Sequence, residues 1–186
     1  MWSLQWKIGR GPVPRRRWSL CASTHLGRST GEASTGGLHG STESFLYPVL
    51  DHAARARAEG QRGTKALLLY PMNALANDQA DRLAKLLTSE PALAGVTAGI
   101  YTGESKGSVR KVTRDSLITD RDQMRADPPD ILLTNYKMLD QLLLREEDRE
   151  IWKRSATSLQ YLVLDEFPRT TMRRGREAYA RFEGMG

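Results

Sequence analysis

The sequence predicts an α/β fold built on a mostly parallel β-sheet. From residue 42 onward, short apolar runs alternate with helical patterns, as is typical of parallel strands joined by right-handed crossovers. The last apolar run, residues 159–164, stops at two adjacent carboxylates, Asp165 and Glu166. A run this apolar indicates a strand buried on both faces, and ligands bind at the carboxyl ends of such strands.

Each element is placed by its apolar period and by the residues that end it. The predicted strands are residues 66–70, 96–101, 131–133 and 159–164. The predicted helices are residues 42–58, a stretch that Asn73 is expected to cap and that Pro91 closes, and the surroundings of residues 138–143. Residues 104–129 are polar and charged, with no regular element expected.

The net charge of +6 is unevenly distributed along the chain. Residues 1–34 carry +5, residues 168–186 carry +3, and residues 35–167 carry −2. We therefore expect three parts: a weakly ordered basic segment (1–34), a folded domain (35–167) and a disordered Arg-rich tail (168–186).

The composition excludes several classes of protein. A single cysteine, Cys21, rules out an internal disulfide framework, and the three histidines are too scattered to suggest a metal site. The chain has neither an apolar stretch that could cross a bilayer nor a secretory signal, so we expect a cytoplasmic protein without membrane contact.

Two acids at a strand end indicate a divalent cation and a water to be activated, as nucleotide hydrolysis requires. The alternative is that a surface loop simply begins at Asp165. A Gly-rich stretch, residues 35–42, lies directly before the first predicted helix, where backbone N–H groups could cradle phosphate. Its Gly36, Gly40 and Thr42 suit that role, but Ser41 stands where a phosphate-binding Lys is needed.

Five short motifs follow one another along the chain. They are Gly40-Ser41-Thr42-Glu43, Tyr70-Pro71-Met72-Asn73-Ala74-Leu75-Ala76, Tyr101-Thr102-Gly103, Asp130-Ile131-Leu132-Leu133-Thr134-Asn135 and Val163-Leu164-Asp165-Glu166. In this order they resemble motif I, motif Ia, the Ib neighbourhood, the segment before motif Ic and motif II of the first RecA-like domain of superfamily 2 DEAD/DEAH-box helicases. The resemblance covers residues 42–167, is closest in style to large bacterial DNA helicases of the Lhr/MrfA type, and rests on the ordered series, which is more specific than any single motif.

The resemblance implies a RecA-like P-loop three-layer sandwich, incomplete at both ends, that uses ATP and Mg²⁺. Asp165 would hold Mg²⁺ together with Thr42, and Glu166 would orient the attacking water. The residues implied to bind ATP are Gly36, Gly40, Ser41 and Thr42. Those implied to contact nucleic acid, with DNA favoured over RNA, are Asn73, Thr102, Gly103 and Thr134; ordinary capping and turn chemistry is the alternative for them.

The chain departs from the family in three places. Ser41 replaces the motif I Lys, residues 27–34 are not strand-like although an apolar strand is expected before motif I, and motifs III to VI with the second RecA-like domain are missing. A separate chain carrying that second domain is therefore a candidate partner, and we expect no catalytic competence from this chain alone. A reading-frame change at each end of a helicase gene is one hypothesis for the sharp limits of the resemblance.

Two other functions compete with a helicase fragment. The Arg-rich flanks, with Trp2, Trp6 and Trp18, could make this a non-catalytic basic nucleic-acid-binding protein. A different P-loop protein, such as a kinase or a transporter ATPase, is disfavoured by the order of the motifs.

Overall fold

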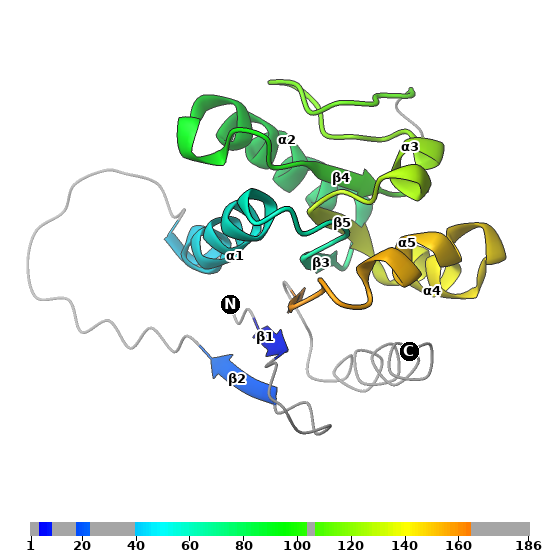
Figure 1. The fold of residues 1–186 in the computed structure, drawn as a ribbon, viewed down its shortest axis with the longest axis horizontal. Coiled ribbons are helices and arrows are strands. Elements are labelled where there is room, and N and C mark those ends of the chain that lie inside the picture. The colour runs from blue at the N-terminus through cyan, green and yellow to red at the C-terminus, as the bar shows by residue number, and fades with distance from the viewer. Residues whose placement is uncertain (1–3, 9–17, 23–39, 104–106, 165–186) are drawn as a thin grey trace, which may run out of the picture.

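The computed structural model describes residues 4–8, 18–22, 40–103 and 107–164, of which 4–8, 18–22 and 40–45 are described as backbone only. Its centre is a six-stranded sheet with the order β2-β1-β6-β3-β5-β4 (Figure 1). The strands are β1 (Leu4–Ile8), β2 (Trp18–Ala22), β3 (Ala66–Tyr70), β4 (Ala98–Tyr101), β5 (Ile131–Asn135) and β6 (Tyr161–Leu164). Strands β6, β3, β5 and β4 are mutually parallel, which confirms the predicted α/β fold with a mostly parallel sheet.

Two strands lie where the sequence shows no strand pattern. Strand β1 pairs antiparallel with both β2 and β6, so that Leu4 lies opposite Leu164, 160 positions later in the sequence. Strand formation depends on neighbours across the sheet as well as on local preference, and local patterns do not reveal such distant partners. The basic N-terminal segment therefore contains two strands that sequence analysis missed, while the division into three parts stays a prediction.

The sheet lies between two layers of helices, as its alternating side chains show. Ala66, Leu68 and Tyr70 of β3 share a core with α1 (Gly40–Ala58) and α2 (Asn73–Ser89). Leu67 and Leu69 belong to a second core with α3 (Arg121–Ala126), α4 (Tyr136–Leu144) and α5 (Arg149–Ser155). Successive strand residues point to opposite faces, so a strand buried on both sides is apolar throughout. The expected three-layer arrangement is confirmed (Figure 1).

The structure confirms the three predicted helices as α1, α2 and α4, whereas sequence analysis missed the shorter α3 and α5. The buried face of α2 combines alanines with leucines, namely Ala76, Ala80, Leu83, Ala84 and Leu87. Helices α3 and α5 have six and seven residues, too few to display a helical period. Two 3₁₀ turns, η1 (Pro91–Leu93) and η2 (Glu146–Asp148), complete the set. Among the described residues, no helix combines the length and apolarity that crossing a bilayer requires.

The polar segment between β4 and α3 returns along the outer edge of β4. Ile118 donates its backbone N–H to the Ala98 carbonyl at 3.0 Å, and its own carbonyl accepts from Ile100 at 2.9 Å. This bridge covers a strand edge that would otherwise present unpaired backbone groups. It also holds the loop of residues 107–120 against β4.

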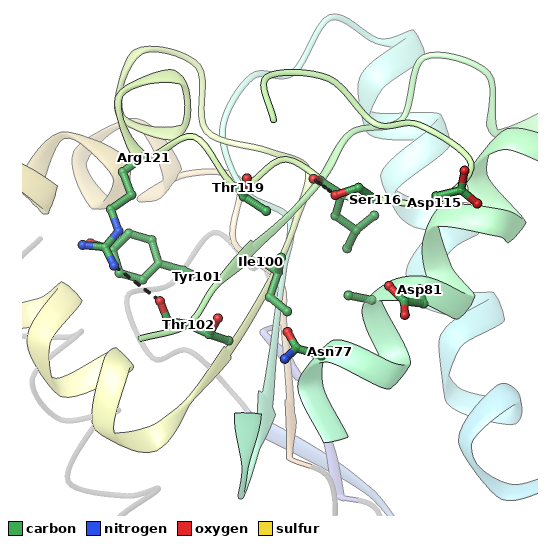
Figure 2. A pocket seen from close by; sticks show the side chains of 11 residues that line it. Asn77, Asp81, Ile100, Tyr101, Thr102, Asp115, Ser116, Thr119 and Arg121 are labelled. Atoms are coloured by element: carbon green, nitrogen blue, oxygen red, sulfur yellow. Dashed lines mark hydrogen bonds between the residues drawn. The ribbon is translucent and has the colours of Figure 1, made fainter. Parts of the chain in front are cut away.

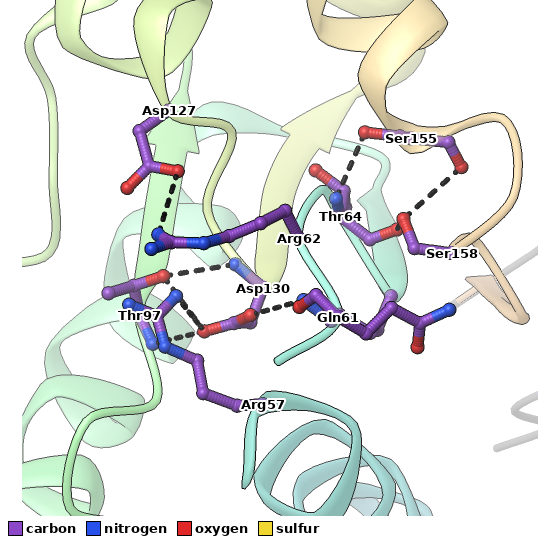
Figure 3. A network of polar contacts seen from close by, with 10 residues as sticks. Arg57, Gln61, Arg62, Thr64, Thr97, Asp127, Asp130, Ser155 and Ser158 are labelled. Atoms are coloured by element: carbon purple, nitrogen blue, oxygen red, sulfur yellow. Dashed lines mark hydrogen bonds and ion pairs between the residues drawn. The ribbon is translucent and has the colours of Figure 1, made fainter. Parts of the chain in front are cut away.

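A buried carboxylate, Asp130, ties together the amino ends of the parallel strands (Figure 3). It accepts hydrogen bonds from Lys65 Nζ at 2.7 Å and from Arg57 Nη1, in the last turn of α1, at 3.1 Å. It also accepts from the Thr97 backbone N–H at 2.8 Å and the Thr97 hydroxyl at 2.9 Å. The side chains of Lys65 and Asp130 are both 0 % exposed. One carboxylate thus joins α1 to the chain segments that enter β3, β4 and β5.

Replacing Asp130 should test how far the fold depends on this pair. We expect Asp130→Asn to lower the free energy of unfolding by about 3–5 kcal/mol, because it leaves the Lys65 ammonium buried without a counter-charge. The matched control is Asp127→Asn, whose 3.6 Å pair with Arg62 has side chains 44 % and 72 % exposed; its cost should stay within about 1 kcal/mol. Urea denaturation of the full chain measures both, and equal losses would contradict the prediction.

Candidate nucleic-acid interface

The residues that the family resemblance assigns to nucleic acid lie at or just after the ends of three neighbouring strands. The register places Tyr70 beside Asn135 and Tyr101 beside Thr134, so β3, β5 and β4 end level with one another. We call this side of the sheet the carboxyl edge. It brings Asn73, Thr102, Gly103 and Thr134 to one side of the molecule, although the first and last are 61 positions apart in the sequence.

Asn73 has a different local role from the expected one. The N-cap position of α2 is Met72, which makes no side-chain cap, and Asn73 is the first helical residue. The Asn73 side-chain oxygen accepts a hydrogen bond from Asn135 Nδ2. The prediction that Asn73 caps the helix is therefore wrong, because a partner on β5 engages the side chain instead.

Asn135 is a residue of this edge that sequence analysis did not single out. Its side-chain oxygen accepts from the Met138 backbone N–H at 2.8 Å and so caps α4, while its amide donates to Asn73. The available signal was an Asn directly before an apolar helical period, which is the usual sign of a helix start. Asn135 thus links the first turns of α2 and α4.

The first turns of these two helices carry no acidic residue, whereas α3 and α5 begin with Asp122 and Glu150. A helix N-terminus bears about half a positive charge through its unpaired N–H groups. At α2 and α4 no nearby carboxylate of the first turn offsets that charge. The carboxyl edge therefore presents two adjacent helix starts suited to anionic groups such as phosphates.

Thr134 lies behind the edge. Its side chain is buried, and its hydroxyl donates to the Tyr101 carbonyl at 2.7 Å. This bond ties the end of β5 to the end of β4, just before Thr102 and Gly103. Thr134 is therefore placed to hold the backbone at the end of β4.

Thr102 and Gly103 form the turn that leaves β4. The Thr102 carbonyl accepts a hydrogen bond from Arg121 Nη2 at 3.4 Å, and Thr102 as a whole is 7 % exposed. Gly103 is exposed, and a Cβ built there would meet only Met138 Sδ, at an ordinary 3.7 Å. Internal packing therefore does not require glycine here, while the lack of a side chain leaves the backbone open to a ligand.

Tyr101, the last residue of β4, fixes the start of this turn through its side chain. Its hydroxyl donates to Asp148 Oδ2 at 3.0 Å, and Arg125 Nε donates to Asp148 Oδ1 at 2.8 Å. The Arg121 guanidinium lies 4.8 Å from the centre of the Tyr101 ring. Burial, and then the negative charge of Asp148, raises the pKa of the Tyr101 hydroxyl, which keeps it a neutral donor.

Asp120 holds the loop that faces the end of β4. Its carboxylate accepts from the Ser108 hydroxyl, from the Gln123 backbone N–H at 2.7 Å and from Arg110 Nε at 3.2 Å. These bonds, led by that of Ser108, lower the pKa of the Asp120 carboxyl to about 2. The same carboxylate caps α3 and closes the loop that begins at residue 107.

Half of the six residues expected to act on ATP and Mg²⁺ fall outside the described part of the chain. Gly36, Asp165 and Glu166 lie beyond it. Gly40, Ser41 and Thr42 form the first turn of the 19-residue helix α1, described as backbone. The first turn of a long helix offers unpaired backbone N–H groups, which phosphate binding uses, so this part of the chain fits such a ligand.

Comparison with known proteins gives one family and one curated relative. The sequence profile of the DEAD/DEAH box helicases matches residues 23–183. Druantia protein DruE of Escherichia coli (strain UMEA 4076-1) is 34 % identical over 122 residues, an alignment that covers 58 % of this chain and 7 % of DruE. The chain therefore corresponds to a small part of the length of that relative. No solved structure gives a significant match.

The match also corrects the limits drawn from the motifs. Sequence analysis confines the resemblance to residues 42–167, but the family profile begins at residue 23 and ends at residue 183. The match thus includes residues 23–34 of the basic N-terminal segment and residues 168–183 of the Arg-rich tail. The hypothesis of a reading-frame change at each end depended on sharp limits, and it loses that support.

The acid stability of the chain should reveal the role of Asp120. Because the folded-state pKa is below the ordinary value of 3.8, the stabilisation is present above about pH 4 and is lost as the pH falls towards 2. We expect Asp120→Asn to unfold more readily at pH 7 and to show a shallower loss of stability between pH 4 and 2. Ser108→Ala should move that loss to higher pH. Acid titration followed by circular dichroism measures this, and identical profiles for all three proteins would refute it.

Proposed function

Because this chain belongs to the DEAD/DEAH box helicase family, we propose that it is the part of a first helicase domain that binds a single nucleic-acid strand along the carboxyl edge. The observation that carries the proposal is the convergence of Asn73, Thr102, Gly103 and Thr134 with two helix N-termini that have no first-turn acid. Backbone N–H groups and small polar side chains of this kind hold phosphates without reading sequence. DNA is the favoured strand, on the resemblance to large bacterial DNA helicases.

The roles at the edge differ from residue to residue. Gly103, through its open backbone, and the first turn of α2 at Asn73 would contact phosphates. Thr134 would act by holding the Tyr101 carbonyl and so the turn that follows it. Asn135 would keep the starts of α2 and α4 at a fixed spacing, since it bonds to both.

The family implies that the nucleotide is ATP, and we propose which residues would hold it. Gly36, Gly40, Ser41 and Thr42 would face the phosphates, Asp165 and Thr42 would hold Mg²⁺, and Glu166 would orient water. ATP hydrolysis supplies the free energy for movement along nucleic acid in this family. Ser41 places no cation on the β- and γ-phosphates, so we propose weak nucleotide binding and no competent hydrolysis without a second helicase domain, in this or a separate chain.

A single substitution can separate strand binding from folding. Asn73→Asp keeps the oxygen that accepts from Asn135 and adds a negative charge at a helix start, where it favours the helix but repels phosphate. We expect roughly five- to ten-fold weaker binding of a labelled single-stranded DNA, with a smaller salt dependence. Fluorescence anisotropy at several salt concentrations measures both quantities.

The control for that experiment is Thr157→Asp, which adds the same charge at an exposed turn between α5 and β6, away from the carboxyl edge. It should change affinity by less than about two-fold. If both variants bind alike, the edge is not the binding surface. If replacing Arg15, Arg16 and Arg17 by Ser, which leaves β1 and β2 in the chain, abolishes binding while Asn73→Asp has no effect, the alternative of a basic nucleic-acid-binding protein replaces the proposal.

Restoring the missing cation should restore nucleotide binding. We expect Ser41→Lys to bind ATP with Mg²⁺ at least about ten-fold more tightly than the natural chain, because a Lys at this place neutralises the phosphates. Ser44→Lys, which adds the same charge one turn further along α1, should not. Titration calorimetry of the three proteins decides this. ATP turnover by the natural chain that disappears in Asp165→Asn would show that it is catalytically competent after all.

A further inference from the structure

A cavity of about 240 Å³ lies next to the carboxyl edge, and the proposed strand contacts do not use it (Figure 2). Its walls come from three places: one face of α2, the last residues of β4, and the loop of residues 115–121. Thr102 belongs both to this wall and to the turn that we assign to nucleic acid. The cavity and the proposed strand path therefore share a boundary.

The interior and the mouth of the cavity differ in chemistry. Ala80, Ile100 and Leu117 supply an apolar lining, and all three are buried. Asn77 and Asp81, one turn apart on α2, face Ser116 and Asp115 across the opening, with Ile100 between them (Figure 2). An apolar lining with a few convergent polar groups is the usual constitution of a small-ligand site.

The polar groups at the mouth are mainly hydrogen-bond acceptors. Asp81 and Asp115 are exposed carboxylates, and within the described residues neither forms an ion pair. The cationic group of the lining, Arg121, is already engaged, since it stacks on Tyr101 and donates to the Thr102 carbonyl. Two carboxylates disfavour a phosphate inside the cavity. They favour a flat, partly apolar group that carries N–H donors.

We propose that the cavity receives one base turned out of the bound strand, and that it prefers bases with an exocyclic amino group over uracil and thymine. This inference rests on the proposed function, because it needs a strand held at Thr102 and Gly103. A cavity of about 150 Å³ already holds benzene, so the volume here accommodates a nucleobase. Bases splayed out of a strand are recognised through hydrogen bonds to their edges, and carboxylates accept from the amino groups of such edges.

The experiment compares two strands whose bases differ along one edge of the ring. The full chain is titrated into labelled single-stranded oligo-dC and oligo-dU of equal length at pH 8 and fixed salt. Cytosine carries an amino group and an unprotonated ring nitrogen where uracil carries a carbonyl oxygen and a ring N–H, so only cytosine offers the exocyclic amino donor. We expect at least about five-fold tighter binding of oligo-dC, the discrimination that one good side-chain pairing to a base edge provides.

Two variants locate the effect. Asp81→Ala removes a carboxylate at the mouth, and Asp78→Ala removes one from the same helix outside the cavity. Both lose one negative charge and should strengthen general phosphate binding, an effect that the ratio of the two affinities cancels; Asp78 differs in that it pairs with Arg82 at 3.8 Å. The preference for oligo-dC should disappear in Asp81→Ala and persist in Asp78→Ala. Its persistence in Asp81→Ala would overturn the assignment to this cavity.

The remaining outcomes separate this inference from the function on which it rests. Equal affinity of the natural chain for oligo-dC and oligo-dU overturns the base site and leaves strand binding intact. Absence of binding to either overturns the proposed function and the base site together. If a short Lys-rich peptide binds, and Asp81→Ala weakens it while the two strands bind alike, the cavity takes a basic protein side chain and the proposal is wrong.

Discussion

The buried pair of Lys65 and Asp130 is the interaction on which the arrangement of the sheet depends. A carboxylate with no exposure needs compensation for its lost hydration, and here a cation, a guanidinium and a threonine supply it from three other segments. The backbone of Asp130 adds to this, because its carbonyl accepts from Lys65 at 2.7 Å and from Ala66 at 3.1 Å. The starting points of β3, β4 and β5 are therefore fixed relative to one another. Strands of four or five residues that begin in register also end in register.

The two ends of the sheet consequently have opposite electrostatic character. At the amino ends, the charges of Lys65 and Asp130 are buried and paired with each other. At the carboxyl edge, the polar groups are neutral side chains and helix N–H groups, held by Asn135 and by the hydroxyl of Thr134. On the proposed function, the stability of the fold and the binding of its ligand thus belong to different ends of the same strands. A substitution at one end should disturb the other only through the register between them.

The sequence predicted elements that local patterns encode and missed those that distant contacts create. Residues 66–70 were predicted correctly because a strand buried on both faces is apolar at every position. Strand β2 was missed because its pairing depends on β1, which in turn pairs with the end of the described chain. The cap assigned to Asn73 was wrong for a related reason, since a residue 62 positions away engages its side chain. Likewise, the family resemblance grouped Thr102 and Thr134 as contacts of one ligand, but the sequence could not show that the hydroxyl of Thr134 faces inward, towards the Tyr101 carbonyl.

The central position of β3 has a consequence for the chain as it is synthesised. Ala66 pairs with Ile131 and with Tyr161, so the two partners of β3 emerge 65 and 95 positions after it. At about 5–20 residues per second, β3 waits roughly 5 to 20 s on the ribosome before its second edge can be covered. Its Leu67, Leu68 and Leu69 form an uncharged run, and such a run with open edges pairs readily with other chains. The strand that unites the finished sheet is therefore open to pairing with other chains for as long as synthesis of its partners takes.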